Sequence, residues 1–177
     1  MAAVITRELD AIKKEYGSKR RTSVENAEEA VYEEKKMEET EVCFLMDRFG
    51  YMKLIDKNAY ERNKEAAHNE NRCVFLCMNT DKICIFTDKG KMHSIKAADI
   101  PLVRFRDKGT PADNLSNYDS SQERMLYVAP LGQIRQDQLL FVTRASMCKL
   151  VEGTEFDVAK RTIAATKLAQ DDDCLLY

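Results

Sequence analysis

The sequence predicts a mainly β protein, a partial β-propeller preceded by a short N-terminal helix and an acidic linker. Three segments carry the prediction because each joins an apolar strand to a second strand through a charged turn, which is typical of a hairpin. They read MDRFGYMKLI (46–55), FTDKGKMHSI (86–95) and VTRASMCKLV (142–151). Their central small residues, Gly50, Gly90 and Ser146, lie 40 and 56 residues apart. Hairpins that recur at such spacings indicate a repeat architecture such as a propeller.

The N-terminal stretch predicts one amphipathic helix. Residues 6–16 place Leu9, Ile12 and Tyr16 on one face, and Gly17 is a suitable C-terminal stop. A basic junction, GSKRRTS, follows at 17–23. Residues 24–39 are rich in Glu and are compatible with an exposed helix or an extended linker, in either case a solvated connector.

From residue 41 onward short apolar runs alternate with polar turns. Strands are expected near 42–46, 51–55, 73–78, 83–87, 91–95, 125–129, 139–143, 147–151 and 173–177. Two long polar loops are expected at 56–71 and 100–119, and long loops on small β units often carry function.

The predicted organisation is therefore a helical lead and acidic linker at 1–40, followed by a β-propeller region at 41–177. The region divides into three units, at about 41–80, 81–135 and 136–177. Closed propellers typically need 4–8 blades, and the sequence stops at DDDCLLY, an acidic turn with a strand just beginning. We therefore expect a piece of a larger repeat array, truncated and with unpaired edges.

Composition excludes several classes of protein. The 177 residues are 44% hydrophobic and 33% charged, and the apolar runs at 42–46 and 139–142 are too short to span a bilayer. The start, MAAVITRELDAIKK, lacks the apolar core of a signal peptide. Most of the six cysteines lie in strand-like apolar runs without a C-x-x-C pair, which favours reduced core thiols in a cytosolic protein.

The net charge of −2 comes entirely from the N-terminal region. Residues 1–40 hold 8 basic and 10 acidic side chains, and residues 41–177 hold 20 of each. Any nucleic-acid role must therefore depend on local clusters of cations.

Four stretches resemble the C-terminal β-pinwheel of the A subunit of bacterial type IIA topoisomerases, the family of DNA gyrase and topoisomerase IV. ELDAIKKEYGSKRRT (8–22) is similar to the last helix and junction of the breakage-reunion core. DRFGYMKLIDKNAYER (47–62) resembles a first blade. FTDKGKMHSIKAADIP (86–101), followed by a basic segment, KG and then NL, resembles a repeat of the pinwheel. TEFDVAKRTIAATKLAQDDDCLLY (154–177) resembles a third blade. Four motifs in the right order cover most of the chain.

The resemblance implies a module that binds duplex DNA without sequence specificity along a basic outer rim and bends or wraps it. It implies a cytoplasmic, nucleoid-associated bacterial protein without a membrane partner. The partners implied are the ATPase B subunit, together with the rest of the A subunit, of an ATP-dependent isomerase that controls DNA supercoiling. The catalytic tyrosine, ATP and Mg²⁺ would belong to other domains, so no cofactor, metal or catalytic residue is expected here.

One segment departs from the gyrase pattern. Gyrase subunits carry a Gln-Arg-Arg-Gly-Gly-Lys-Gly box after the first hairpin, where this chain reads AYERNKEAAHNEN (59–71). Arg62 and Lys64 keep basic character, but the glycines are gone and three glutamates intrude. Because carboxylates repel phosphate, we expect weaker chiral wrapping than in gyrase and leave open whether the parent is gyrase or topoisomerase IV.

The strongest candidate for DNA contact is the loop at 104–109, where three cations in five residues can meet successive phosphates. Hairpin tips and an equivalent loop of the third unit add further cations. The candidate residues are Arg104, Arg106, Lys108, Gly109, Arg48, Arg62, Lys64, Lys89, Lys91, Arg144, Lys160 and Arg161. Lys53 and Lys149 are compatible with either phosphate contact or coverage of apolar surface. Tyr60 and Phe105 are expected to pack under loops.

The sequence leaves two alternatives to DNA binding. A propeller-type protein–protein interaction module is compatible with the near-neutral charge, and so is a structural spacer that has lost affinity for DNA. The salt dependence of binding separates DNA binding from both alternatives. Phosphate contacts weaken steeply with salt, whereas a protein interface depends on apolar or aromatic residues.

Overall fold

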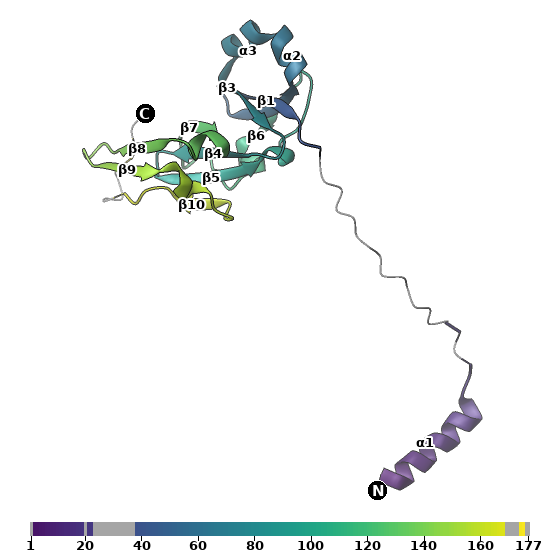
Figure 1. The fold of residues 1–177 in the computed structure, drawn as a ribbon. Helices are drawn as coiled ribbons and strands as arrows, with labels where there is room; N and C mark the ends of the chain where they lie inside the picture. The colour runs from purple at the N-terminus through teal and green to yellow at the C-terminus, as the bar shows by residue number, and fades with distance from the viewer. Residues whose placement is uncertain (1, 20, 23–37, 169–173, 176–177) are drawn as a thin grey trace. The chain divides into compact units, whose positions relative to one another are not determined.

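The computed structural model describes residues 2–19, 21–22, 38–168 and 174–175 (Figure 1). The chain divides into two compact units, Met1–Lys36 and Met37–Tyr177. In the first unit, α1 (Ala2–Tyr16) confirms the predicted helix and begins four residues earlier. The N–H of Gly17 donates to the carbonyl oxygen of Lys13 at 3.0 Å, where the helix ends. Among the described residues, no helix combines the length and apolar character that crossing a bilayer requires.

The second unit confirms the mainly β prediction. Its described residues form two four-stranded antiparallel sheets and one two-stranded hairpin, with strand orders β3-β1-β2-β6, β10-β5-β4-β7 and β8-β9. The strands are β1 (Glu41–Asp47), β2 (Tyr51–Asp56), β3 (Asn71–Met78), β4 (Lys82–Thr87), β5 (Lys91–Lys96), β6 (Thr110–Pro111), β7 (Met125–Pro130), β8 (Gln138–Val142), β9 (Cys148–Glu152) and β10 (Thr162–Ala164).

Each four-stranded sheet, or blade, is completed by a strand from the unit that follows it in sequence. Blade 1 is built on the β1–β2 hairpin, with β3 beside β1 and the later strand β6 beside β2. Blade 2 repeats this plan on the β4–β5 hairpin, with β7 beside β4 and β10 beside β5. The units expected from sequence are therefore interlocked by strand exchange.

The blades stack so that β4, a central strand of blade 2, is buried on both faces. Ile83 and Ile85 of β4 pack against blade 1, together with Phe44 of β1. Cys84 and Phe86, on the opposite face of β4, pack toward the β8–β9 hairpin. Burial on both faces explains why β4 reads as a continuous apolar run rather than an alternating one.

The three hairpin turns confirm the alignment of the repeats. Gly50, Gly90 and Ser146 have positive φ angles of 84°, 69° and 64°, and each N–H donates to the carbonyl oxygen three residues earlier. This left-handed conformation after a tight turn is costly for residues with a Cβ, which explains glycine at two of the three positions.

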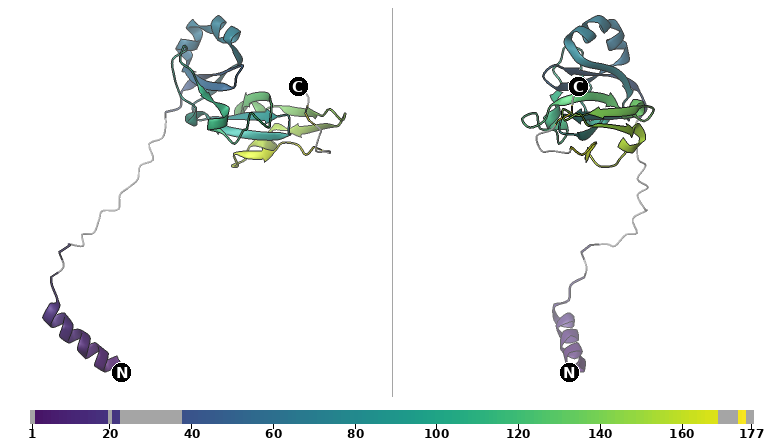
Figure 2. Two further views of the ribbon diagram at one scale, coloured as in Figure 1. Left: turned by 180° about the vertical axis from the view of Figure 1, so that it is seen from behind. Right: turned by 90° about the vertical axis from the view of Figure 1, so that its left-hand side faces the viewer.

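The predicted loop at 56–71 is wrong, because the segment forms α2 (Lys57–Arg62) and α3 (Lys64–Glu70). Its Ala, Glu, Lys and Arg residues favour helix, and buried Ala67 and half-buried Tyr60 pack against one face of blade 1. Figure 2 shows the two helices linking β2 to β3, away from β8 and β9. Packing against blade 1 thus stabilises two helices whose apolar pattern is too weak to be recognised in the sequence.

The expected loop at 100–119 is interrupted by β6 and by α4 (Ala112–Leu115). Strand β10 was not predicted, because three residues are too few for a recognisable pattern. Of the strand expected at 173–177, only 174–175 lie within the described residues, where Leu175 forms an isolated bridge with Thr143. The linker at 24–39 lies outside the described residues except for its last two positions.

The remaining short helices follow strands: η1 (Ala97–Asp99), α5 (Leu131–Ile134) and η2 (Gly153–Phe156). The prediction of core cysteines is confirmed at Cys43, Cys77 and Cys84, whose thiol pKa values are raised to about 12 by burial. It is wrong at Cys148, which is exposed on β9, the outermost described strand of the last hairpin.

Candidate nucleic-acid interface

Two basic loops occupy equivalent places in the fold. Residues 103–109 lead into β6, which pairs with β2, and residues 157–161 lead into β10, which pairs with β5. The equivalence extends to the next residues, because the N–H of Ala112 donates to Gly50 O at 3.0 Å and that of Ala165 to Gly90 O at 2.8 Å. The sequence-predicted match between the 104–109 loop and Lys160–Arg161 therefore holds in three dimensions.

The first loop is a tight turn that exposes its cations. Arg104 O accepts the N–H of Asp107 at 3.0 Å, and Asp107 Oδ2 accepts the N–H of Arg104 at 3.2 Å. The side chains of Arg104, Arg106 and Lys108 are exposed, while Phe105 is half-buried. The carboxylate of Asp107 is thus used to close the turn.

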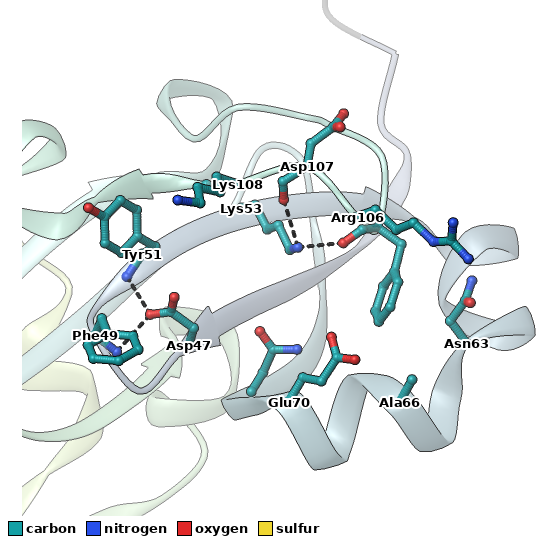
Figure 3. Close-up of a pocket in the computed structure, with 13 residues that line it drawn as sticks. Asp47, Phe49, Tyr51, Lys53, Asn63, Ala66, Glu70, Arg106, Asp107 and Lys108 are labelled. Carbon is teal, nitrogen blue, oxygen red and sulfur yellow. Dashed lines mark hydrogen bonds between the residues drawn. The ribbon is translucent and has the colours of Figure 1, made fainter.

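Lys53 on β2 holds this loop in place. Its Nζ donates to the carbonyl oxygens of Phe105 at 2.6 Å and Asp107 at 2.9 Å, and lies 5.4 Å from the centroid of the Phe105 ring. Figure 3 shows Lys53 beneath the loop, with Arg106 extending toward Asn63 and Lys108 toward Tyr51. Lys53 is therefore an anchor of the loop, so its charge is directed inward at carbonyl groups.

A cavity of about 660 Å³ lies between this loop, the first hairpin and α3. Its lining includes the cations Lys53, Arg106 and Lys108 and the carboxylates of Asp47, Glu70 and Asp107. Because three positive charges face three negative ones, the cavity interior has no excess positive charge. A phosphate is better placed on the outside of the loop than inside this cavity.

Gly109 has a structural explanation that involves no ligand. A Cβ at this position would lie 2.2 Å from Met52 O, so only glycine allows the chain to approach β2 closely. Its φ angle is not in the left-handed region. The expected approach of backbone to phosphate is therefore unnecessary to account for this residue.

The hairpin-tip cations lie in different environments. Arg48, Lys89 and Arg144 are exposed at the three turns. Lys91, at the start of β5, places Nζ 2.5 Å from Glu123 Oε1 and thus has an internal partner. In the second loop Lys160 is exposed, and Arg161 Nη2 lies 3.9 Å from Asp99 Oδ2.

The remaining predicted residues lie around blade 1. Arg62 is exposed on α2 and Lys64 on α3, so helices occupy the position of the gyrase box. Tyr60 and Phe105 pack against the buried side chains of the outer face of blade 1, which confirms that both are packing residues. Phe105 lies in a loop as expected, but Tyr60 lies on the helix α2. Lys149 is exposed on β9.

A buried polar network fixes the segment that leads into β7. Glu123 is 7% exposed and His93 is 1% exposed, and Glu123 Oε2 lies 3.1 Å from His93 Nε2. His93 Nδ1 lies 3.1 Å from Thr162 Oγ1 on β10. Burial raises the pKa of the Glu123 carboxyl, but hydrogen bonds from Lys91 and His93 outweigh it and lower the pKa overall.

Sequence reasoning missed two exposed arginines near Arg48. Arg72 and Arg124 line a common pocket with it. A signal was available, because each arginine directly precedes the apolar run of an outer strand, in NRCVFL (71–76) and ERMLYV (123–128). The inward role of Lys53 cannot be read from the sequence, because its contacts come from residues more than 50 positions away.

Comparisons with known proteins agree with the predicted resemblance. The family model described as DNA gyrase C-terminal domain, beta-propeller, matches residues 81–120 and 137–175. The DNA gyrase A protein of Clostridium acetobutylicum is 28% identical over 184 residues, and that of Streptococcus pneumoniae 25% over 189 residues. These alignments cover 97% and 99% of this chain but only 22% and 23% of the relatives.

Two solved structures share the fold. The C-terminal domain of DNA topoisomerase IV matches with a TM-score of 0.65 and 21% identity, covering 79% of this chain and 45% of that one. The E. coli ParC C-terminal domain matches with a TM-score of 0.58 and 9% identity, covering 77% and 55%.

Proposed function

Since this chain carries the repeats of the DNA gyrase A C-terminal domain family, we propose that residues 41–177 bind duplex DNA without sequence preference and bend or wrap it. The module would belong to the A subunit of a type IIA topoisomerase and position DNA for ATP-dependent strand passage. Its partners would be duplex DNA, the ATPase B subunit, and the rest of the A subunit, in the bacterial cytoplasm at the nucleoid. ATP and Mg²⁺ would act in other domains of that enzyme.

One observation carries the proposal. Both segments matched by the family model contain an exposed basic loop, and the two loops lead into equivalent exchanged strands. Arg104, Arg106 and Lys108 in one loop and Lys160 in the other repeat with the blades, so phosphates along a curved duplex can meet them in turn. Contacts of this kind bind the DNA backbone and do not read its sequence.

Helices α2 and α3 stand where gyrase has its glycine-containing box, and this difference argues for weak rather than strong wrapping of DNA. α2 and α3 expose Glu61, Glu65 and Glu70 beside Arg62 and Lys64. Since carboxylates repel phosphate, this part of blade 1 would contribute little to the path of DNA. We therefore propose bending along the loops rather than strong chiral wrapping.

The test is fluorescence anisotropy of the full chain with a short labelled duplex across a salt series. We expect log affinity to fall linearly with log salt, because each neutralised phosphate contributes a slope of about 0.9. Reversing Arg104, Arg106 and Lys108 to Glu should abolish binding. The charge-matched control reverses Arg7, Lys13 and Lys14 on α1 and should retain it.

Equal loss in both triple variants would show that only net charge matters. Absence of salt-dependent binding by the unmodified chain would instead favour the protein-interaction alternative. That alternative has a candidate surface on the last hairpin, where Leu140 and Leu150 are paired across the strands and are 63% and 57% exposed.

A further inference from the structure

A second concave site, which shares Asp47 and Phe49 with the cavity beside Lys53, lies where the first blade meets the second. It is a pocket of about 200 Å³ lined by three arginines, Arg48, Arg72 and Arg124. They come from three separated segments of the chain: the β1–β2 turn, the start of β3 and the residue before β7. Convergence of three like charges is electrostatically unfavourable unless an anion or a carboxylate compensates it.

Hydrogen bonds of the backbone hold the segments that carry Arg48 and Arg124 in place. In the turn that carries Arg48, Asp47 Oδ1 accepts the N–H groups of Phe49 and Tyr51 at 2.8 and 2.9 Å. The N–H of Arg124 donates to Asp88 Oδ1 at 2.9 Å, and its carbonyl oxygen accepts the N–H of Asp88 at 3.0 Å. These bonds fix the positions from which the two side chains project.

Arg72 is placed by an irregularity in the sheet. Met46 pairs with Cys73 and Asp47 with Asn71, so Arg72 is an extra residue in β3. Such bulges redirect a side chain and occur often beside functional sites. Its Nη2 donates to Met125 O at 3.2 Å, so the guanidinium reaches from blade 1 to blade 2.

The charge balance of this pocket is positive. Its lining has three arginines and two carboxylates, those of Asp47 and Asp113. Asp47 Oδ1 is occupied by two backbone N–H groups, and Asp113 Oδ1 accepts the N–H of Ser120 at 2.7 Å. Across the described residues, the ion pairs found involve none of Arg48, Arg72 or Arg124.

We propose that Arg48, Arg72 and Arg124 form a cradle that holds a single phosphodiester group of the bound duplex. The inference rests on the proposed DNA binding and adds a fixed anchoring point at the junction of two blades. Arginine suits this role because its planar guanidinium donates two parallel hydrogen bonds to phosphate oxygens. Ser120, exposed in the same lining, supplies a hydroxyl to the same group.

A single shared phosphate predicts non-additive effects, which distinguishes a cradle from independent contacts. Arg48→Gln and Arg124→Gln should each weaken duplex binding about tenfold. Both single variants and the double variant should lower the salt slope by no more than about 0.9, the contribution of one phosphate. Arg7→Gln combined with Lys13→Gln on α1 is the charge-matched control and should leave the slope unchanged.

Arg72 needs a conservative partner variant because its side chain also bonds to Met125 O. Arg72→Lys keeps the charge but removes the two-pronged donor, so it should weaken binding as Arg124→Gln does while preserving the urea unfolding midpoint. Titration of the full chain with inorganic phosphate, followed by ¹H–¹⁵N NMR, should shift the amide signals of Arg48, Ser120 and Arg124 first.

The outcomes separate the two proposals. If the unmodified chain binds DNA but the double variant behaves like the control, the cradle is wrong and DNA binding stands. A slope loss of about two in the double variant also overturns the cradle, because it indicates independent contacts. The cradle is likewise overturned if the amide signals that inorganic phosphate shifts most belong to residues outside the pocket. Failure of the unmodified chain to bind any duplex overturns both proposals.

Discussion

The first two hairpins share a frame but secure their exchanged strands by different chemistry. Aligned on Gly50 and Gly90, Lys53 of β2 and His93 of β5 occupy the same position. Lys53 is half-buried and bonds to loop carbonyls at the edge of an open cavity. His93 is buried and lies against Glu123 and, on the exchanged strand, Thr162. One position therefore supports a solvent-accessible anchor in blade 1 and an internal polar network in blade 2.

Because of this difference, we expect the two blades to differ in rigidity. Hydrogen bonds between buried polar groups are costly to break, whereas water can readily take over the hydrogen bonds of a half-exposed lysine. Blade 2 is also covered on both faces, by blade 1 and by the last hairpin. We therefore expect blade 2 to be the stable centre of the unit and the 104–109 loop to open more easily.

The largest expected effect comes from the turns. Gly90→Ala should destabilise the fold by about 3 kcal/mol, because it adds left-handed strain and places a Cβ 2.6 Å from Thr166 O. Gly50→Ala meets only Met125 Cε at 3.8 Å and should cost about 1 kcal/mol. Urea unfolding of the two variants measures the difference. Equal costs would show that packing around the exchanged strand does not distinguish the blades.

The next effect concerns the buried carboxylate of blade 2. Glu123→Gln should cost about 1–2 kcal/mol at pH 7, because the charged hydrogen bonds are weakened. The folded-state pKa of Glu123 is below its ordinary value of 4.5, so its ionisation stabilises the fold above that value. This contribution is lost as the pH falls through the lowered pKa.

The unmodified chain should therefore lose its advantage over Glu123→Gln as the pH is lowered from 5 toward 3. Urea midpoints at several pH values for both proteins test this. A gap that stays constant with pH would contradict the assigned role of the carboxylate.

A smaller effect is expected for the anchor in blade 1. Lys53→Met should cost about 1 kcal/mol, because it removes two hydrogen bonds from a half-buried site. Its clearer consequence is local: amides of residues 104–109 should exchange hydrogen faster. Lys149→Met, on the exposed strand β9, serves as the control and should leave exchange at 104–109 unchanged. Unaltered protection in Lys53→Met would mean that the loop is held by its own turn.

The smallest effect on stability is expected at the tip of the first hairpin. Phe49 is 87% exposed and corresponds to Lys89 in the second turn. Phe49→Lys should change the free energy of unfolding by less than about 0.5 kcal/mol. If blade tips contact the duplex, the salt slope should rise by about 0.9. An unchanged slope would place the tip of blade 1 away from DNA.

The sequence predicts the hairpins well because their information is local. Two apolar strands and a turn residue suited to positive φ lie within ten residues of one another, as Gly50 and Gly90 show. The helices α2 and α3 were missed because their apolar positions are few and depend on blade 1 for burial. β10 was missed because its partner β5 lies about 70 residues away and it contributes only three residues.

The candidate site shows the same contrast between local sequence patterns and contacts between distant residues. Exposed cations in loops and turns can be found from sequence, as at Arg104 and Lys160. Their partners cannot, because the pairs Lys91–Glu123 and Arg161–Asp99 join residues 32 and 62 positions apart. The grouping of Arg48 with Arg72 and Arg124 likewise depends on the contact between two blades.

Because strands are exchanged between repeats, the repeat that is read in the sequence is not the blade that folds. A repeat copied or deleted at its sequence boundary would take with it the strand that completes its predecessor, as β6 completes blade 1 and β10 completes blade 2. Deleting a repeat at that boundary would leave the hairpin edge of its predecessor unpaired until the exchanged strand of the following repeat takes the vacant place. Because β2 pairs with β6 and β5 pairs with β10, every cut between β2 and β10 divides at least one strand pairing, so rearrangement of this architecture depends on exchanged strands of different repeats being interchangeable.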